Sequence, residues 1–180
     1  MNWVGSKVST QRLSLRPIQD QDLQHIYRGL SDPKVIKHYG VSFSSMEETK
    51  EQMDWYRKLI ENKTGIWFAL ELKESNEFIG AVGLNDIKKE HRRGEIGFWL
   101  LPEFWGSGYI SDAVPKVLEY GFRTLKLHRI EAWVETENEK SRKALTKLGF
   151  QYEGTLRDHE FKNGRFISVD ILANIVDNFV

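Results

Sequence analysis

Two closely spaced glycines lie in the segment Trp105-Gly106-Ser107-Gly108-Tyr109, between an apolar run and a strongly amphipathic run of helical period. Glycines let the backbone turn its N–H groups toward a ligand, and the first turn of a helix adds partial positive charge. A loop of this kind can hold phosphate through its main chain, without a lysine. The segment therefore predicts a phosphate cradle formed by the amides of residues 106–109.

Other phosphate-binding loops fit this segment less well. A P-loop needs Gly-Lys followed by Ser or Thr, and the chain contains no such sequence. A dinucleotide fingerprint needs a third glycine where this chain has Ser111, and it lacks the intervening residues 102–105. Its acidic partner could still be Glu131 or Glu135, so this alternative stays open. An ordinary glycine-containing loop also stays open, because two glycines before a helix are weak evidence by themselves.

The composition argues against several other kinds of chemistry. The chain of 180 residues has no cysteine, which removes disulfides, thiolate metal sites and cysteine nucleophiles. Its five histidines are scattered, so we expect no metal site. The 26 basic and 26 acidic residues balance, which argues against a nucleic-acid partner. Residues 1–7 do not resemble a signal peptide, and no apolar stretch approaches the ~20 residues that span a bilayer. We therefore expect a soluble, cytoplasmic protein with no membrane partner.

The first half of the chain predicts helices followed by an antiparallel sheet. Asp20 and Asp22 are good helix starters, and Ser45 with Glu48 forms a capping box before a second helix. That second helix is expected to end near Gly65. The predicted strands are residues 12–18, 66–72, 78–84 and 95–101, of which the last three form an antiparallel meander because only short turns join them.

The second half predicts two helices and a closing hairpin. The helix over residues 110–125 contains Pro115, which is tolerated if the helix begins near Ser111 and otherwise predicts a kink. A further helix over 138–148 is closed by Gly149. A strand over 130–134 separates them, and strands over 151–157 and 165–173 are joined by an Asn163-Gly164 turn. One mixed-sheet α+β domain over residues 1–180 is the economical interpretation.

The glycine segment and its surroundings resemble the GNAT acetyltransferase superfamily, and among its members the ribosomal-protein N-acetyltransferases of the RimJ/RimL-like group. The family loop reads Gln/Arg-x-x-Gly-x-Gly/Ala, and this chain departs from it with Glu103, as that group often does. Other resembling segments follow in the family's order, over about residues 10 to 175: Thr10–Pro17, Gly94–Leu100, Asn138–Phe150 and the hairpin that begins at Gly154. The resemblance implies the GNAT fold, a mixed, mostly antiparallel sheet of about seven strands, splayed between strands 4 and 5 and flanked by helices.

The resemblance also implies that acetyl-CoA is the cosubstrate and that an amine attacks it directly, within one ternary complex. The backbone of residues 99–101 would then pair with the pantetheine arm, and the glycine loop would bind the diphosphate. Asn138 would bond the arm, while a plain helix N-cap is a strong alternative that can coexist with that role. Arg142 or Lys143 could meet phosphate charge, and a solvated helix face stays open for both. The residues that the resemblance assigns to the cosubstrate are Trp99, Leu100, Leu101, Trp105, Gly106, Ser107, Gly108, Tyr109, Asn138, Ser141 and Arg142.

Three residues are candidates for proton transfer. By the resemblance, Ser141 lies where the family's proposed general acid protonates the leaving thiolate. Glu160 matches a glutamate proposed as the base in the branch that acetylates ribosomal L7/L12, and Glu95 on the predicted fourth strand is its rival. Positioned acids and bases typically contribute ~10²–10⁴-fold to a rate. An ordinary exposed side chain remains an open interpretation for each of the three.

The acceptor and the surroundings of the diphosphate stay open. A peptide N-terminus, a polyamine or another small amine could be acetylated, by a monomer or a homodimer. A non-catalytic acyl-CoA-binding or regulatory domain is the alternative to an enzyme. Glu103 adds negative charge beside the expected diphosphate, and we expect its side chain to point away from it.

Overall fold

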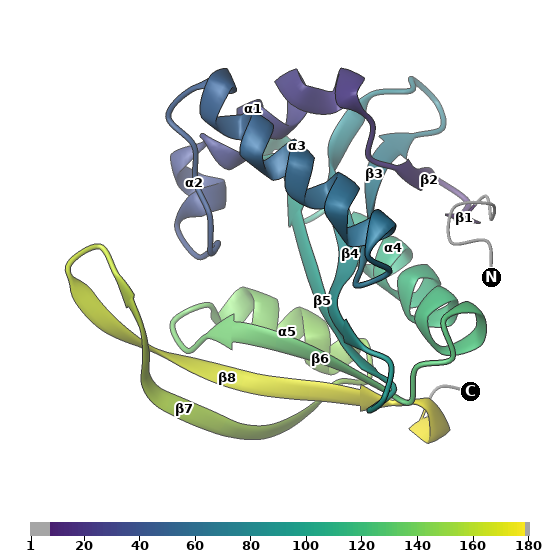
Figure 1. Ribbon diagram of the computed structural model, residues 1–180, viewed down its shortest axis with the longest axis vertical. Coiled ribbons are helices and arrows are strands. Elements are labelled where there is room, and N and C mark those ends of the chain that lie inside the picture. The colour runs from purple at the N-terminus through teal and green to yellow at the C-terminus, as the bar shows by residue number, and fades with distance from the viewer. Residues whose placement is uncertain (1–7, 179–180) are drawn as a thin grey trace.

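The computed structural model describes residues 8–178 and shows one twisted sheet with helices on both faces (Figure 1). The interpretation of residues 1–7 as no signal peptide lies outside the described residues. The strands are β1 (Val8–Ser9), β2 (Leu13–Pro17), β3 (Ile66–Leu72), β4 (Phe78–Lys88), β5 (Arg93–Leu100), β6 (Arg129–Glu135), β7 (Gln151–Lys162) and β8 (Arg165–Ile175). The helices are α1 (Leu23–Leu30), α2 (Pro33–Ile36), α3 (Met46–Glu61), α4 (Tyr109–Glu119) and α5 (Glu139–Lys147).

The predicted α+β GNAT fold is confirmed, with eight strands among residues 8–178 in place of about seven. The strand order is β1-β2-β3-β4-β5-β6-β8-β7, and β5 with β6 is the one parallel pair among the described strands. The additional strand is β1, a two-residue edge strand paired with β2. The predicted meander is present as β3, β4 and β5. The predicted hairpin is β7 and β8, whose turn residues Asn163 and Gly164 have positive φ values of 50° and 78°.

Two hydrophobic clusters hold the helices against opposite faces of the sheet. On one face, Ile26 of α1 and Tyr56 of α3 pack against Trp67 and Trp99. On the other face, the apolar side of α4 and Leu145 of α5 pack against the sheet. Burying apolar surface contributes roughly 25 cal/mol per Å², so both layers stabilise the sheet substantially.

The helix boundaries differ from the predictions at two places. The prediction that the second helix ends near Gly65 is wrong: α3 ends at Glu61, and Lys63 takes the left-handed conformation that usually ends a helix, with φ 56°. Gly65 is needed for another reason, since a Cβ there would lie 2.5 Å from the Leu84 carbonyl oxygen. The next helix, α4, begins at Tyr109 and not near Ser111.

The other local signals agree with the structure in most details. Ser45 caps α3 by accepting a bond from the Glu48 amide at 3.2 Å, but the Glu48 carboxylate accepts from Ser44 and not from Ser45. Because α4 begins early, Pro115 lies inside it and cannot donate to the Ser111 carbonyl. A π-helical turn over 120–124 follows α4. Within residues 8–178, none of the helices is long and apolar enough to cross a membrane.

Candidate active site

Strands β5 and β6 are neighbours for three residue pairs and then diverge. Arg93 to Glu95 pair with Arg129 to Glu131, and no pairing of the two strands is present beyond Glu95 in the described chain. Figure 1 shows the strands separating from their shared end. An unpaired strand edge presents backbone donors and acceptors, so an extended ligand can bind there as an additional strand would.

The free backbone groups on this edge of β5 belong to Phe98 and Leu100. Leu101 donates its amide to the Ile79 carbonyl at 2.9 Å, on the side of β4. Antiparallel pairing alternates between the two sides of a strand, so the groups of Phe98 and Leu100 face the opening. The Leu100 carbonyl also accepts a bond from Trp105 Nε1 at 2.8 Å. Both backbone groups of Leu101 are occupied, since its carbonyl accepts from the 3₁₀ turn that follows β5.

The loop after β5 leaves a row of main-chain amides without partners. Gly106 and Gly108 have φ values of 77° and 80°, a left-handed conformation that favours glycine. Gly108 is the N-cap of α4, so the following amides point out of the first turn of a helix. The amides of residues 106–109 donate to no acceptor within the described residues, and residues 106–108 are exposed. This is the geometry of an anion site.

Arg12 reaches this loop from the start of β2 and was not among the predicted site residues. Its Nη1 donates to the Ser107 carbonyl at 2.9 Å, and its Nε donates to Asp112 of α4 at 2.7 Å. The guanidinium carbon lies 4.6 Å from the centre of the Tyr109 ring. Arg12 and Ser107 are 95 positions apart, so local sequence patterns could not connect them.

Glu103, the departure from the family loop, is paired with a cation. Its carboxylate accepts a charge-assisted bond from Arg28 of α1. Because this pair neutralises the carboxylate, Glu103 does not add uncompensated negative charge to the loop. The prediction that Glu103 points away from a bound diphosphate stays a prediction.

Helix α5 brings Asn138 and Ser141 together at its N-terminus. The Asn138 side-chain oxygen accepts from the Ser141 amide at 3.2 Å, which is the predicted N-cap and leaves the Asn138 side-chain amide free to donate. Ser141 is half-buried, and its hydroxyl has no partner within the described residues. Arg142 donates to the buried Asp170 at 3.2 Å, so only the rest of its guanidinium is available to a phosphate.

Glu95 lies at the point where the two strands separate. It is the last residue of β5 that pairs with β6, and it is half-buried. Burial, together with the negative charges of Asp86, Glu131 and Glu160, raises the pKa of Glu95 to about 7. Its carboxylate makes no hydrogen bond or ion pair within residues 8–178. A partly desolvated carboxylate with a pKa near neutrality can accept and release a proton at working pH.

Glu160 lies on β7 opposite Ile167 and is exposed. It is close enough to influence the charge of Glu95, so the two predicted bases belong to one region. The neighbouring Glu131 is already engaged, by Arg129 at 2.7 Å and by Arg93 at 3.3 Å. Of these three carboxylates, Glu95 therefore combines partial burial with no ion pair among the described residues, and the charge of Arg93 offsets only part of the rise in its pKa.

A group of polar side chains fastens the β7–β8 hairpin to the segment after α2. Lys162 donates to Glu135 at 2.6 Å and to the Tyr39 carbonyl at 3.0 Å, and His38 Nδ1 lies 2.7 Å from Glu135. With Glu131 paired as well, both acidic residues of the dinucleotide alternative have other partners. The mostly antiparallel sheet also differs from the parallel sheet of that fold, so the dinucleotide interpretation is not supported.

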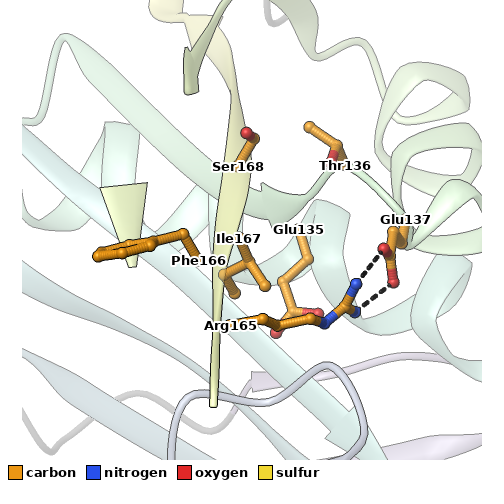
Figure 2. A pocket seen from close by; sticks show the side chains of 7 residues that line it. All are labelled: Glu135, Thr136, Glu137, Arg165, Phe166, Ile167 and Ser168. Carbon is orange, nitrogen blue, oxygen red and sulfur yellow. Dashed lines mark hydrogen bonds and ion pairs between the residues drawn. The ribbon is translucent and has the colours of Figure 1, made fainter. Parts of the chain in front are cut away.

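A small pocket of about 150 Å³ lies beside the hairpin, and Glu135 is among the residues that line it. Figure 2 shows its lining, with Arg165 reaching across to Glu137 in a two-bond ion pair of 2.7 and 2.8 Å. Its volume is below the range of roughly 300–1,000 Å³ that is usual for small-molecule sites. None of the residues predicted to bind the cosubstrate line it.

Comparison with known proteins gives consistent matches along most of the chain. Residues 12–151 match the acetyltransferase (GNAT) domain family. The uncharacterized N-acetyltransferase YoaA of Bacillus subtilis is 39% identical over 158 residues, which cover 87% of this chain and 89% of that protein. The crystal structure of spermidine N-acetyltransferase from Vibrio cholerae with CoA and spermine is 28% identical, with a TM-score of 0.84 over 93% of this chain and 98% of that one. The structure of RimL, a ribosomal L7/L12 alpha-N-protein acetyltransferase, with coenzyme A has a TM-score of 0.87 at 20% identity over 96% and 99% of the two chains, a likeness of fold.

Proposed function

The chain belongs to the GNAT acetyltransferase family, and we propose that it acetylates a small cationic amine that binds beside Glu95. It is an acyl-CoA-dependent N-acetyltransferase with acetyl-CoA as its cosubstrate. The observation that carries the proposal is the row of free amides at residues 106–109, beside the opening between β5 and β6. One end of that opening suits a diphosphate, and the other end holds a basic carboxylate.

The residues along the opening fit the parts of acetyl-CoA in order. The amides of residues 106–109 would receive the diphosphate, because a helix N-terminus attracts negative charge. The free backbone groups of Phe98 and Leu100 would pair with the amides of the pantetheine arm, with the Asn138 side chain on the opposite side. This places the arm one residue earlier on β5 than the predicted Trp99–Leu101, because the backbone of Leu101 is occupied.

The proposed chemistry needs two proton transfers by side chains. An amine is protonated at neutral pH and cannot attack, so Glu95 takes a proton from the ammonium group. The amine nitrogen then forms a bond to the acetyl carbon. As the bond from that carbon to sulfur breaks, the nitrogen gives its second proton to solvent and becomes the neutral amide. The leaving thiolate takes a proton from the Ser141 hydroxyl, which regains it from solvent. The free Ser141 hydroxyl and the free Glu95 carboxylate support these two roles.

The proposed acceptor is a polyamine-like molecule. Four carboxylates, of Glu95, Asp86, Glu131 and Glu160, lie close enough together for the last three to raise the pKa of the first. Asp86 is paired with Lys88 and Arg93, and Glu131 with Arg129 and Arg93. Glu95 and Glu160 have no ion pair within residues 8–178, so these two carboxylates can attract a molecule with more than one positive charge. The similar Vibrio cholerae enzyme, which was crystallised with CoA and spermine, also supports this class of acceptor. The cytoplasmic location, the single domain and the monomeric or homodimeric state stay predictions.

A thiol-release assay with a panel of amines tests the proposal. With acetyl-CoA and spermidine, we expect free thiol to appear at a rate proportional to the enzyme concentration. The rate should be higher than with a primary amine that carries no second charge, or with a peptide that has a free N-terminus. A faster rate with the peptide would replace the proposed acceptor. Tight CoA binding without thiol release from any amine would instead favour the non-catalytic acyl-CoA-binding domain.

The role of Ser141 predicts a selective loss of turnover in Ser141→Ala. We expect kcat to fall about 10-fold, less than the ~10²–10⁴-fold usual for positioned acids and bases, because a hydroxyl is a weak acid. The dissociation constant of CoA, measured by calorimetry, should change less than threefold. Thr146→Ala is the control, since Thr146 lies on the same helix with its hydroxyl bonded to the Arg142 carbonyl at 2.9 Å. A loss of CoA affinity without a loss of kcat would make Ser141 a binding residue only.

A further inference from the structure

We propose that Arg12 binds the diphosphate of acetyl-CoA directly and, at the same time, holds the loop of residues 106–109 in its binding conformation. This inference rests on the proposed function, because it assumes that the diphosphate lies at that loop. It adds a side chain from the first strands of the chain to a site that otherwise consists of main-chain amides.

Three contacts fix the Arg12 guanidinium against the loop and the helix behind it. Nη1 donates to the Ser107 carbonyl at 2.9 Å, Nε donates to Asp112 Oδ2 at 2.7 Å, and the flat face lies over the Tyr109 ring. These contacts reach a loop residue and two residues of the first turn of α4. A guanidinium held on two edges and one face has little freedom left, so its remaining edge points in one direction.

That remaining edge lies where the diphosphate is expected. Nη2 of Arg12 has no acceptor within the described residues. A Cβ placed on Gly108, the N-cap of α4, would lie 3.3 Å from Nη2, so Nη2 is beside the first free amides. Arginine is well suited to phosphate, because its planar donors match the oxygen spacing of the anion. The glycine at 108 therefore leaves room for both a left-handed backbone and this side chain.

Arg12 also removes an electrostatic obstacle. Asp112 lies in the first turn of α4, where its negative charge would oppose a bound diphosphate. The ion pair with Arg12 Nε neutralises the charge of Asp112 beside the loop of residues 106–109. Exposed ion pairs contribute little to folding, and the two side chains are 44% and 30% exposed. A purely structural role for Arg12 thus predicts small effects, whereas a role in binding predicts large ones.

The test compares Arg12→Met, Arg12→Lys and Asp112→Asn with the wild type by calorimetry with CoA. We expect Arg12→Met to weaken CoA binding by about 10- to 100-fold, the range for losing a charge-assisted hydrogen bond, with Arg12→Lys intermediate. Asp112→Asn should bind CoA as tightly as the wild type or more tightly, because the guanidinium stays and a negative charge leaves. Weaker binding by Asp112→Asn would mean that Arg12 acts only by tethering the loop.

Kinetics with two thioesters separate binding from general damage. Acetyl-pantetheine carries the reacting group without the diphosphate, so Arg12→Met should keep the wild-type kcat/KM for it and raise the KM for acetyl-CoA with little change in kcat. Arg57→Met is the matched control, since Arg57 is exposed and paired with Asp54 and Asp20 on α3 and the turn before α1. Two results would overturn the inference: an equal loss of kcat/KM with both thioesters in Arg12→Met, or a KM for acetyl-CoA in Arg12→Met that is the same as in Arg57→Met.

A loop variant distinguishes failure of this inference from failure of the proposed function. Gly108→Ala puts a Cβ on a backbone with φ 80°, a conformation that residues with a Cβ rarely adopt, and is expected to displace the free amides. If Gly108→Ala weakens CoA binding and Arg12→Met does not, the inference about Arg12 is wrong and the cradle stands. If neither variant changes CoA binding, the diphosphate does not lie at this loop.

Discussion

Glu95→Gln is expected to lower kcat by about 10²–10⁴-fold, the range for removing a positioned general base. Glutamine has nearly the same shape as glutamate but cannot accept the proton of the ammonium group. The glycine loop is separate in sequence from Glu95, so the dissociation constant of CoA, measured by calorimetry, should stay within threefold of the wild type. A Glu95→Gln enzyme with wild-type kcat would remove Glu95 from the proposed mechanism.

The pH dependence gives the same prediction a second readout. Burial and three neighbouring carboxylates raise the pKa of Glu95 to about 7, and only the ionised form can take a proton. The kcat/KM of the wild type should therefore rise as the pH increases through about 7. In Glu95→Gln, that rise should be absent, and only the ionisation of the acceptor amine should remain in the profile. Rates from pH 5 to 9 with spermidine at a fixed concentration measure the difference.

Glu160→Gln is the matched control, since it makes the same replacement, a carboxylate by an amide, in the other predicted base. Glu160 is exposed on β7, and its charge contributes to the raised pKa of Glu95. We expect Glu160→Gln to keep kcat within a few-fold and to move the rise in kcat/KM to lower pH. A large loss of kcat in Glu160→Gln, with little loss in Glu95→Gln, would show that the base is on β7.

As the pH rises through about 7, the free energy of unfolding of the wild type should fall while its kcat/KM rises. The pKa of Glu95 is higher in the folded state, about 7, than its ordinary value of 4.5, so between these values the folded protein binds more protons than the unfolded one. The contribution of Glu95 to stability is present below pH 4.5 and is lost as the pH rises through about 7. Above pH 7, Glu95→Gln should therefore be more stable than the wild type, by on the order of 1–3 kcal/mol. Urea denaturation at pH 5 and pH 8 measures the free energy of unfolding of both proteins. If the advantage of Glu95→Gln over the wild type were smaller at pH 8 than at pH 5, the raised pKa would be contradicted.

Local signals in the sequence predicted most of the fold. The Asn163-Gly164 turn, the Ser45 cap and the Asn138 cap each depend on residues within four positions, and all three are present. The end of α3 was predicted incorrectly because a lysine, Lys63, adopts the left-handed conformation that the prediction assigned to Gly65. The role of Gly65 depends on Leu84, a contact that no local pattern contains.

The site was predictable only where one segment carries its geometry. The glycine loop and the start of α5 were located from the sequence, because their donors lie within a few residues of each other. Arg12 was missed, since its partner Ser107 is 95 positions away. The proposal of Glu95 over Glu160 as the base also depends on the structure, because burial and the charges of Asp86, Glu131 and Glu160 raise the pKa of Glu95. Residue types and spacing thus predict main-chain sites better than side-chain electrostatics.

Arg16→Met is expected to reduce the free energy of unfolding by about 3–5 kcal/mol, the range for breaking a buried ion pair from one side. Arg16 joins β2 to two carboxylates. It donates two bonds of 2.8 Å to Asp22, whose side chain is 2% exposed, and two bonds of 2.6 and 2.9 Å to Glu71 of β3. Asp22 also accepts the Gln19 amide at 2.8 Å. Without Arg16, the charge of Asp22 stays buried with only a backbone donor to compensate it.

A double-mutant cycle isolates this interaction from the loss of the arginine side chain. Asp22→Asn keeps an oxygen for the Gln19 amide and removes the charge, so Arg16→Met/Asp22→Asn should be more stable than the sum of the two single changes predicts. Arg57→Met is again the control, since it breaks two ion pairs whose members are at least 52% exposed and should change the free energy of unfolding little. Guanidinium denaturation of the four proteins, with equal slopes, gives the coupling energy. Additive effects of Arg16→Met and Asp22→Asn would instead show that the two side chains stabilise the fold independently.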